Sequence, residues 1–137
     1  MSSIRYESNR KITAAEFIGL LQRSTLAERR PVGSPARIEK MLKYGNVLVT
    51  AWDGDLLVGV SRALTDFSFC CYLSDLAVDE AYQHKGIGKE LIKQTHHVSG
   101  DDEAMLILLA APKAKEYYPK IGMEQFPECF VIRRKSN

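Results

Sequence analysis

Residues 75–91 have the sequence Asp75-Leu76-Ala77-Val78-Asp79-Glu80-Ala81-Tyr82-Gln83-His84-Lys85-Gly86-Ile87-Gly88-Lys89-Glu90-Leu91. A strand-like apolar run enters a glycine-containing turn here, and a helix is expected from near Gly86 to near Val98. Such a turn directs several backbone N–H groups to one point, where the helix N-terminus adds partial positive charge. Gly86 and Gly88 leave room for a close anion. The stretch therefore predicts an anion site, to which nearby side chains add donors or charge: Gln83, His84, Lys85 and Lys89.

The spacing of the glycines excludes two well-known phosphate motifs. The dinucleotide-binding fingerprint has a third glycine three residues after the second, and this chain has Leu91 there. The Walker motif needs a glycine five residues before the Gly88-Lys89 pair, and this chain has Gln83 there. On its own, the turn is equally compatible with a tight strand-to-helix connection that binds no ligand. The residues on either side of the turn are needed to distinguish this interpretation from an anion site.

Two helices are expected before this stretch. Thr13 and Glu16 form a capping box, which predicts a helix that extends to about Ser24. Ser34-Pro35 combines an N-cap with a proline at the first helical position, which predicts a second helix that extends to about Tyr44.

Strand composition predicts an antiparallel meander between these helices and the turn. A short first strand is expected at residues 4–7. Residues 46–52 and 56–63 flank Asp53-Gly54, which is a strong hairpin signal because a tight turn there needs positive φ. A further strand at residues 69–78 completes the meander and leads into the turn.

The sequence after the predicted helix alternates strands and a helix. Residues 104–110 form a continuous apolar run, which predicts a strand buried on both faces. Pro112 is expected to open a short helix that ends around residues 118–119, with Gly122 as its terminator. Residues 130–133 are expected to form a last strand. The whole pattern predicts an α/β protein with a mixed sheet and helices on both faces.

Length and composition fit a single globular domain that spans residues 1–137. The formal net charge of +2 argues against nucleic acid or an anionic membrane as partners. Three cysteines without a CxxC pair argue against a disulfide framework. The N-terminus lacks an apolar leader, and no apolar run approaches the roughly 20 residues of a membrane span. The chain is therefore predicted to be cytoplasmic.

The flanks of the turn carry a family resemblance. Gln83-x-x-Gly86-x-Gly88 after Leu76-Ala77-Val78-Asp79 resembles the acetyl-CoA motif of the GNAT N-acetyltransferase superfamily. The segment Ala114-Lys115-Glu116-Tyr117-Tyr118-Pro119-Lys120-Ile121-Gly122-Met123 resembles the tyrosine-containing helix of that family and its Gly-Phe-like end. The resemblance covers nearly the whole chain and points to the small single-domain bacterial type. It implies the GNAT acyl-CoA N-acyltransferase fold, whose mixed, mostly antiparallel sheet has about six to seven strands and about four flanking helices.

The resemblance implies acetyl-CoA as cosubstrate and no metal. In this family the strand before the turn splays from its neighbour, so the pantetheine arm would pair with backbone groups of Leu76, Ala77 and Val78. The diphosphate would bind the turn, which assigns a cofactor-binding role to Gln83, His84, Lys85, Gly86, Ile87, Gly88 and Lys89. Many members also have an asparagine seven residues before the catalytic tyrosine. Ala111 stands there in this chain, so one contact with CoA is missing or supplied differently.

The implied reaction is direct attack of a neutral amine on the thioester, with Tyr118 as the proton donor to the leaving thiolate. Tyr117, one residue away, is expected to face the core. Asp75 is either a general base acting through a water or a structural carboxylate that caps a backbone group or pairs with an arginine. Glu28 and Arg29 lie in a loop where the family builds its acceptor site, and are either substrate-binding residues or solvated surface charges.

Three functions remain open at this point. The leading one is acetyl transfer to a primary amine of a small molecule, with a peptide or protein N-terminus as the alternative acceptor. The second is a non-catalytic acyl-CoA-binding or regulatory module, and the third is a phosphate-binding domain unrelated to CoA. The acceptor, the length of the acyl group and the oligomeric state are left open, with a homodimer contact near Phe130 as one alternative to a monomer.

Overall fold

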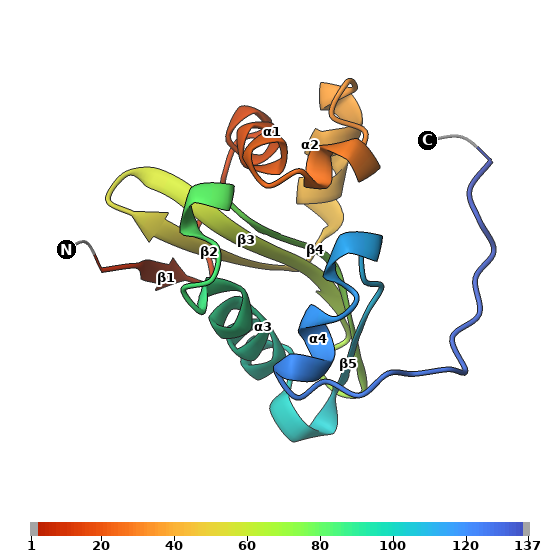
Figure 1. Ribbon diagram of the computed structural model, residues 1–137. Coiled ribbons are helices and arrows are strands. Elements are labelled where there is room, and N and C mark those ends of the chain that lie inside the picture. The colour runs from red at the N-terminus through yellow and green to blue at the C-terminus, as the bar shows by residue number, and fades with distance from the viewer. Residues whose placement is uncertain (1–2, 136–137) are drawn as a thin grey trace.

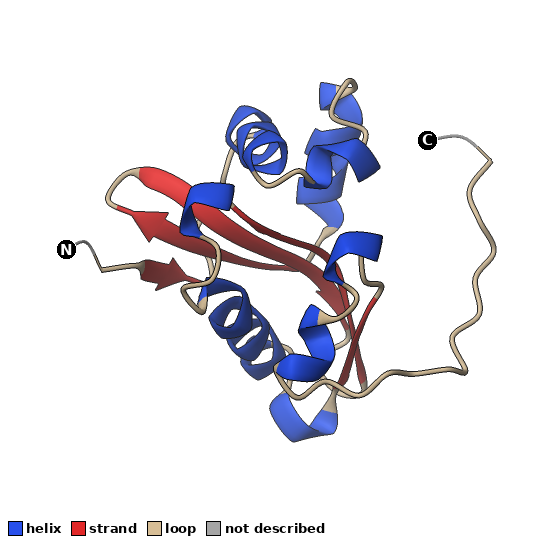
Figure 2. Cartoon of the chain, in the orientation of Figure 1, coloured by secondary structure: helices blue, strands red, loops and turns tan. Residues whose placement is uncertain are grey.

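A computed structural model describes residues 3–135, so Met1, Ser2, Ser136 and Asn137 of the predicted domain lie outside the described residues. Five strands form one sheet in the order β1-β2-β3-β4-β5 (Figure 2). Neighbouring strands are antiparallel up to β4, and β5 is parallel to β4, so the sheet is mixed as predicted. The strands are β1 (Arg5–Glu7), β2 (Val47–Asp53), β3 (Leu56–Thr65), β4 (Cys70–Val78) and β5 (Met105–Leu108).

Helices cover both faces of this sheet. The α-helices are α1 (Ala14–Arg23), α2 (Pro35–Tyr44), α3 (Ile87–Val98) and α4 (Tyr117–Lys120). Helices α1 and α2 lie on one face, and α3 and α4 lie on the other (Figure 1). Four short 3₁₀ helices occur in the connections: η1 (Leu26–Arg29), η2 (Glu80–Tyr82), η3 (Asp101–Glu103) and η4 (Pro112–Ala114). No helix of the described chain is both long and apolar enough to cross a bilayer.

The local signals in the sequence act as expected at three element boundaries. Thr13 and Glu16 form the predicted capping box, with reciprocal hydrogen bonds of 3.0 and 2.9 Å between side chain and backbone N–H. Ser34 accepts a hydrogen bond from the backbone N–H of Arg37 at the start of α2. Gly54 adopts a φ of +61° in the hairpin between β2 and β3, which a residue with a Cβ rarely adopts.

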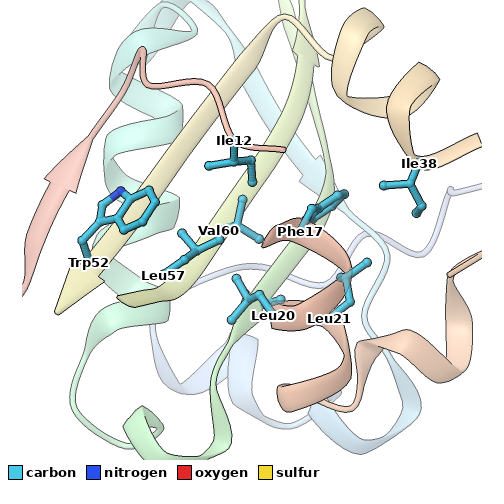
Figure 3. Packing of buried hydrophobic residues seen from close by; sticks show 9 residues of the cluster. Ile12, Phe17, Leu20, Leu21, Ile38, Trp52, Leu57 and Val60 are labelled. Carbon is cyan, nitrogen blue, oxygen red and sulfur yellow. The ribbon is translucent and has the colours of Figure 1, made fainter. Parts of the chain in front are cut away.

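The larger core lies between the sheet and helices α1 and α2 (Figure 3). Phe17, Leu20 and Leu21 form the buried stripe of α1, and all three are fully inaccessible to solvent. They pack with Ile38 of α2 against apolar side chains of the sheet, among them Val60. Burial of each such side chain stabilises the fold by about 1.5–3 kcal/mol. This core fixes helix α1 and the loop that follows it above strand β4.

A second core lies between the sheet and α3, which begins directly after the glycine turn. Ile87 and Leu91 of α3 are buried against β2 and β3. Gly59 of β3 permits this close approach, because a Cβ at that position would lie 3.0 Å from Leu91 Cδ1 and 3.1 Å from Ile87 Cγ2. The N-terminus of α3 is therefore held firmly beside the end of β4.

The C-terminal part of the chain differs from expectation in four ways. The described residues form a sheet of five strands, so the predicted six to seven strands are not confirmed. Residues 130–133 do not form the predicted strand, because their backbone groups have no pairing partner among the described residues and a strand needs one. The run at residues 104–110 is not buried on both faces, because β5 is an edge strand on which Met105 and Ile107 are exposed. The helix predicted from Pro112 is split into η4 and α4.

Candidate active site

A cavity of about 520 Å³ opens where strands β4 and β5 separate, beneath the loop that follows α1. Residues of β4, of the turn, of η1 and of the segment after β5 line it. These lining residues include many that the sequence singled out: Glu28, Arg29, Leu76, Ala77, Val78, Gln83, Ala111 and Tyr118. The structure therefore brings together, in one cavity, residues that lie up to 90 positions apart in the chain.

The separation of β4 from β5 exposes an edge of backbone to this cavity. The parallel pairing runs from Cys70 opposite Met105 to Leu73 opposite Leu108, and β5 ends there. Strand β4 continues to Val78 and pairs only with β3 over that part. Its other edge therefore has backbone groups with no neighbouring strand, which an extended ligand can pair with as an added strand does. The predicted splay of the strands is thus present in the fold.

Two groups of this edge already have partners. Gln83 Nε2 donates a 3.1 Å hydrogen bond to the carbonyl oxygen of Val78. Arg30 Nη2 donates a 2.6 Å hydrogen bond to the carbonyl oxygen of Ser74. The side chain of Gln83 therefore ties the turn to the end of β4.

The turn itself has the backbone geometry of an anion site. His84 and Gly86 have φ values of +65° and +83°, and Gly86 is the N-cap of α3 without a side-chain hydrogen bond. The first N–H groups of a 12-residue helix thus lie open beside the side chains of His84, Lys85 and Lys89, all exposed. This part of the site lies beyond the cavity lining. Gly86 and Lys89 border a second hollow of about 330 Å³ instead.

Gly88 and Tyr117 meet at the start of α3. A Cβ at Gly88 would lie 3.0 Å from the hydroxyl oxygen of Tyr117, which is tighter than ordinary contact. Tyr117 is 37% exposed, so it does not point into the core as expected, but covers the glycine turn. The ring of Tyr117 also contacts that of Tyr118 edge to face, with centroids 5.2 Å apart.

Tyr118 is half-buried and lines the cavity opposite the open edge of β4. Burial, and to a lesser extent the neighbouring Tyr117, raises the pKa of the Tyr118 phenol above its usual 10.0. The hydroxyl therefore keeps its proton at neutral pH and is able to donate it. Although Pro119 follows, Tyr118 lies within α4.

Asp75 is held in a buried cluster with two arginines. Its side chain is completely buried, and its two carboxylate oxygens form ion pairs with Nε of Arg30 and Nε of Arg62. Arg62 also donates hydrogen bonds to the carbonyl oxygen of Met41 at 3.1 Å and to Ser74 Oγ at 3.2 Å. Both oxygens are thus occupied, which favours the structural reading of Asp75 over the reading as a base. We refer to Arg30, Arg62 and Asp75 as the arginine–aspartate cluster.

The arginine–aspartate cluster lies next to η1, which forms one wall of the cavity. Glu28 and Arg29 are exposed residues of η1 that line the cavity, and Arg30, which follows them, is fixed by Asp75. Sequence reasoning named Glu28 and Arg29, but it did not find Arg62. No local pattern signals that partner, since the two arginines lie 45 and 13 residues from Asp75. Within the described residues, no group of three His, Cys, Asp or Glu side chains is placed to hold a metal ion.

A family model described as "Acetyltransferase (GNAT) domain" matches residues 23–131. A histone acetyltransferase of Glycine max is 36% identical over 73 residues, which are 53% of this chain and 32% of that protein. The chain thus spans about a third of the length of this curated relative.

Two solved structures share the fold at low identity. A GNAT-family acetyltransferase of Streptococcus pneumoniae has a TM-score of 0.73 at 23% identity, and the alignment covers 98% of each chain. An aminoglycoside N-acetyltransferase in complex with CoA has a TM-score of 0.75 at 15% identity, covering 99% of this chain and 97% of that one. At such identities the likeness concerns the fold alone.

Proposed function

This chain belongs to the GNAT acetyltransferase family, and we propose that it transfers an acetyl group from acetyl-CoA to the primary amine of a small molecule in the cytoplasm. One observation carries the proposal: a single cavity joins the open edge of β4, the hydroxyl-bearing Tyr118 and the charged residues of η1. The open edge supplies a place for the donor, Tyr118 a proton donor, and η1 a place for the acceptor.

The donor binds along β4 and the turn in this proposal. The pantetheine arm pairs with backbone groups of Leu76, Ala77 and Val78, where β4 has no neighbour on the cavity side. The diphosphate binds the N–H groups between His84 and Lys89. Ala111 lines the cavity but has no polar side-chain atom, so its contact with CoA is through backbone or apolar surface.

The reaction in this site is a direct acyl transfer. The amine nitrogen attacks the thioester carbonyl carbon, a C–N bond forms, and the C–S bond breaks as the tetrahedral intermediate collapses. The attacking nitrogen releases one proton to solvent, the leaving sulfur takes one from the Tyr118 hydroxyl, and the Tyr118 phenolate then regains a proton from solvent. The raised pKa of Tyr118 suits this role, because the phenol is fully protonated over the neutral range.

The amine must arrive without its extra proton. Asp75 is a poor candidate for the base because both of its oxygens are paired with arginines. Glu28 is exposed at the cavity lining and has no arginine partner in the described chain. In this proposal Glu28 attracts the ammonium group, and the fraction that is already neutral reacts.

The charges at the η1 end also suggest what else the acceptor carries. Arg29 lines the same side of the cavity as Glu28, whereas the guanidinium of Arg30 beside it is already bonded to Asp75 and to two carbonyl oxygens. Guanidinium groups recognise planar or tetrahedral oxyanions. An amine that also bears a carboxylate or a phosphate therefore fits this end better than a purely cationic amine.

Two other functions keep specific support. The relative named as a histone acetyltransferase supports a protein amine as the acceptor. The absence of a polar side chain at Ala111 supports a module that binds acyl-CoA without catalysis. The single cavity of about 520 Å³ with charges of both signs in its lining favours the small-molecule acceptor over both.

Release of free thiol from acetyl-CoA, measured across a panel of amines, tests the proposal. The panel contains simple amines, amines with a carboxylate or phosphate, aminoglycosides and a histone-tail peptide. Turnover that is fastest with small anionic amines supports the proposal. Turnover with the peptide alone contradicts the small-molecule assignment, and no turnover with any amine contradicts catalysis.

Tyr118→Phe tests the role of the hydroxyl with the best amine of that panel. General acid catalysis contributes about 10²-fold or more, so kcat is expected to fall by roughly that factor while KM for acetyl-CoA stays within about twofold. Because the pKa of Tyr118 is raised, the wild-type kcat should show no loss from phenol ionisation below about pH 10. An unchanged kcat would remove Tyr118 from the mechanism.

A further inference from the structure

The connection between α1 and α2, residues 24–34, contributes one wall of the cavity, and we refer to it as the η1 wall. None of the four residues of η1 is buried. The backbone hydrogen bonds of the η1 wall join residues that are near neighbours in the sequence, within the wall or at the adjoining ends of α1 and α2. These local bonds shape the wall, but they do not fix its distance from strand β4.

Arg30 is the residue that connects the η1 wall to the sheet. Its Nε donates to a carboxylate oxygen of Asp75, and its Nη2 donates a 2.6 Å hydrogen bond to the carbonyl oxygen of Ser74. Its Nη1 donates a 2.8 Å hydrogen bond to the carbonyl oxygen of Arg29 within η1. Among the residues that the structure describes, no other member of the η1 wall has a hydrogen bond or ion pair to a strand. One guanidinium thus joins η1 to two consecutive residues of β4.

The carboxylate that receives Arg30 is itself fixed in orientation. Asp75 is fully buried, and its second oxygen pairs with Nε of Arg62, which lies opposite it on β3. Arg62 is held in turn by hydrogen bonds to the carbonyl oxygen of Met41 and to Ser74 Oγ. Hydrogen bonds between guanidinium and carboxylate groups are strong and geometrically specific. Arg30 therefore meets β4 in one defined position.

The η1 wall also contains a residue in a strained backbone conformation. Thr25, the N-cap of η1, has a φ of +71° and makes no capping hydrogen bond with its side chain. A β-branched residue rarely adopts this left-handed conformation. Such conformations persist only where the surrounding contacts maintain them. Thr25 is exposed, so the bonds that Arg30 makes at the other end of η1 are among the contacts that oppose its relaxation.

We propose that Arg30 is a positioning residue for acetyl transfer, which holds the η1 wall, with Glu28 and Arg29, at one distance from the open edge of β4. The inference rests on the proposed function, in which the thioester lies along that edge and the amine approaches from η1. A misplacement of reacting groups by about 1 Å can cost about 100-fold in rate. Each nitrogen of the Arg30 guanidinium already has a protein partner, so Arg30 acts through η1 and not by contact with the acceptor.

Steady-state kinetics of Arg30→Gln tests the positioning role. The value of kcat/KM for the amine should fall by about 10-fold or more, while the dissociation constant for acetyl-CoA stays within about twofold. The loss should be the same for amines with and without a carboxylate or phosphate. Arg30→Lys keeps the charge beside Asp75 but not the planar fork, so it should recover only part of the loss. Arg5→Gln, which breaks an exposed ion pair with Glu7 on β1, is the matched control and should change neither value.

Amide hydrogen exchange of the free chain, followed by mass spectrometry, tests the connection without any reaction. In Arg30→Gln, peptides that cover residues 26–34 should exchange about 10-fold faster or more, because the wall is no longer joined to the sheet. Peptides from the core helix α1 should exchange as in the wild type, since Phe17, Leu20 and Leu21 still anchor it. Arg5→Gln should leave both regions unchanged.

Three results would overturn the inference. Unchanged exchange of residues 26–34 in Arg30→Gln would mean that the partly buried Leu26, Ala27 and Val32, which pack against the larger core, hold the wall by themselves. A loss of kcat/KM confined to amines with a carboxylate or phosphate would make Arg30 a substrate-binding residue. Unchanged turnover in Arg30→Gln, with an active wild-type chain, would refute the inference alone. A wild-type chain that turns over no amine would refute the proposed function and, with it, this inference.

Discussion

The two ends of the cavity are built in different ways. In the proposed function the donor end consists of backbone: the unpaired edge of β4, which lines the cavity, and the N–H groups of the turn at residues 84–89, which lie beyond that lining. The proposed acceptor end consists of side chains on η1, beside the buried arginine–aspartate cluster. A backbone site needs glycines and strand-to-helix order at fixed spacing, so it leaves a local pattern in the sequence. A side-chain site assembled from distant residues leaves none, which is why the sequence indicates a place for the donor but neither the acceptor nor the arginine–aspartate cluster.

The largest expected effect concerns the support of the acceptor end. Asp75→Asn removes the negative charge between two arginines while the buried guanidinium of Arg62 remains. Removing one partner of a buried ion pair costs about 3–5 kcal/mol, so the free energy of unfolding should fall by that amount. Urea denaturation measures it. Asp55→Asn, on an exposed residue of the β2–β3 hairpin, is the control and should change stability by less than about 0.5 kcal/mol.

The opposite outcome for Asp75 would reverse its assignment. A variant with wild-type stability and strongly reduced kcat would make Asp75 a general base and not a structural carboxylate. The arginine–aspartate cluster would then take part in catalysis. It could no longer be described as the structural support of the acceptor end.

The second-largest expected effect is a loss of affinity for acetyl-CoA at the donor end. Gly88→Ala places a Cβ 3.0 Å from the hydroxyl oxygen of Tyr117, which must then move across the turn. The dissociation constant for acetyl-CoA should rise by about 10-fold, or about 1.4 kcal/mol, as measured by calorimetry. Tyr117→Phe in the same chain removes the clashing oxygen and should restore part of the affinity. Gly33→Ala, where a Cβ meets nothing within 4 Å, is the control. Unaltered affinity in Gly88→Ala would mean that the diphosphate does not bind this turn.

The fold was predictable where the elements are defined locally. The bounds of α2 follow from Ser34-Pro35, and the β2–β3 hairpin follows from Asp53-Gly54. The prediction failed at the C-terminal strands because strand pairing is not a local property. Residues 130–133 have the composition of a strand, but composition does not supply a partner for the backbone.

For the candidate site, the sequence indicated residues that line the cavity but not the contacts that these residues make. Tyr118, which the resemblance of residues 114–123 to the tyrosine-containing helix of the family singles out, lines the cavity. The neighbouring Tyr117 was expected in the core, yet it covers Gly88, because a four-residue helix turns the two rings in different directions. The partners of Asp75 come from η1 and β3, and only the packed fold brings those elements together.

The smallest expected effect separates the two ends directly. Glu28→Gln removes a negative charge from the acceptor end without touching the open edge of β4. KM for the best amine should rise a few-fold, by about 1 kcal/mol or less, because the group is exposed and screened. The dissociation constant for acetyl-CoA should not change. Steady-state kinetics with Glu39→Gln on the exposed surface of α2 as control measures the difference. Equal losses for both substrates would contradict the division of the cavity.

Calorimetric titration of the wild-type chain with acetyl-CoA, in the absence of any amine, tests the central claim most directly. If the backbone of β4 and the turn forms a complete donor site, one molecule of acetyl-CoA binds each chain without help from the acceptor. Free CoA should then bind the same site, and inorganic pyrophosphate should compete weakly with both. A correctly folded chain that produces no binding heat with acetyl-CoA at several temperatures would contradict the account.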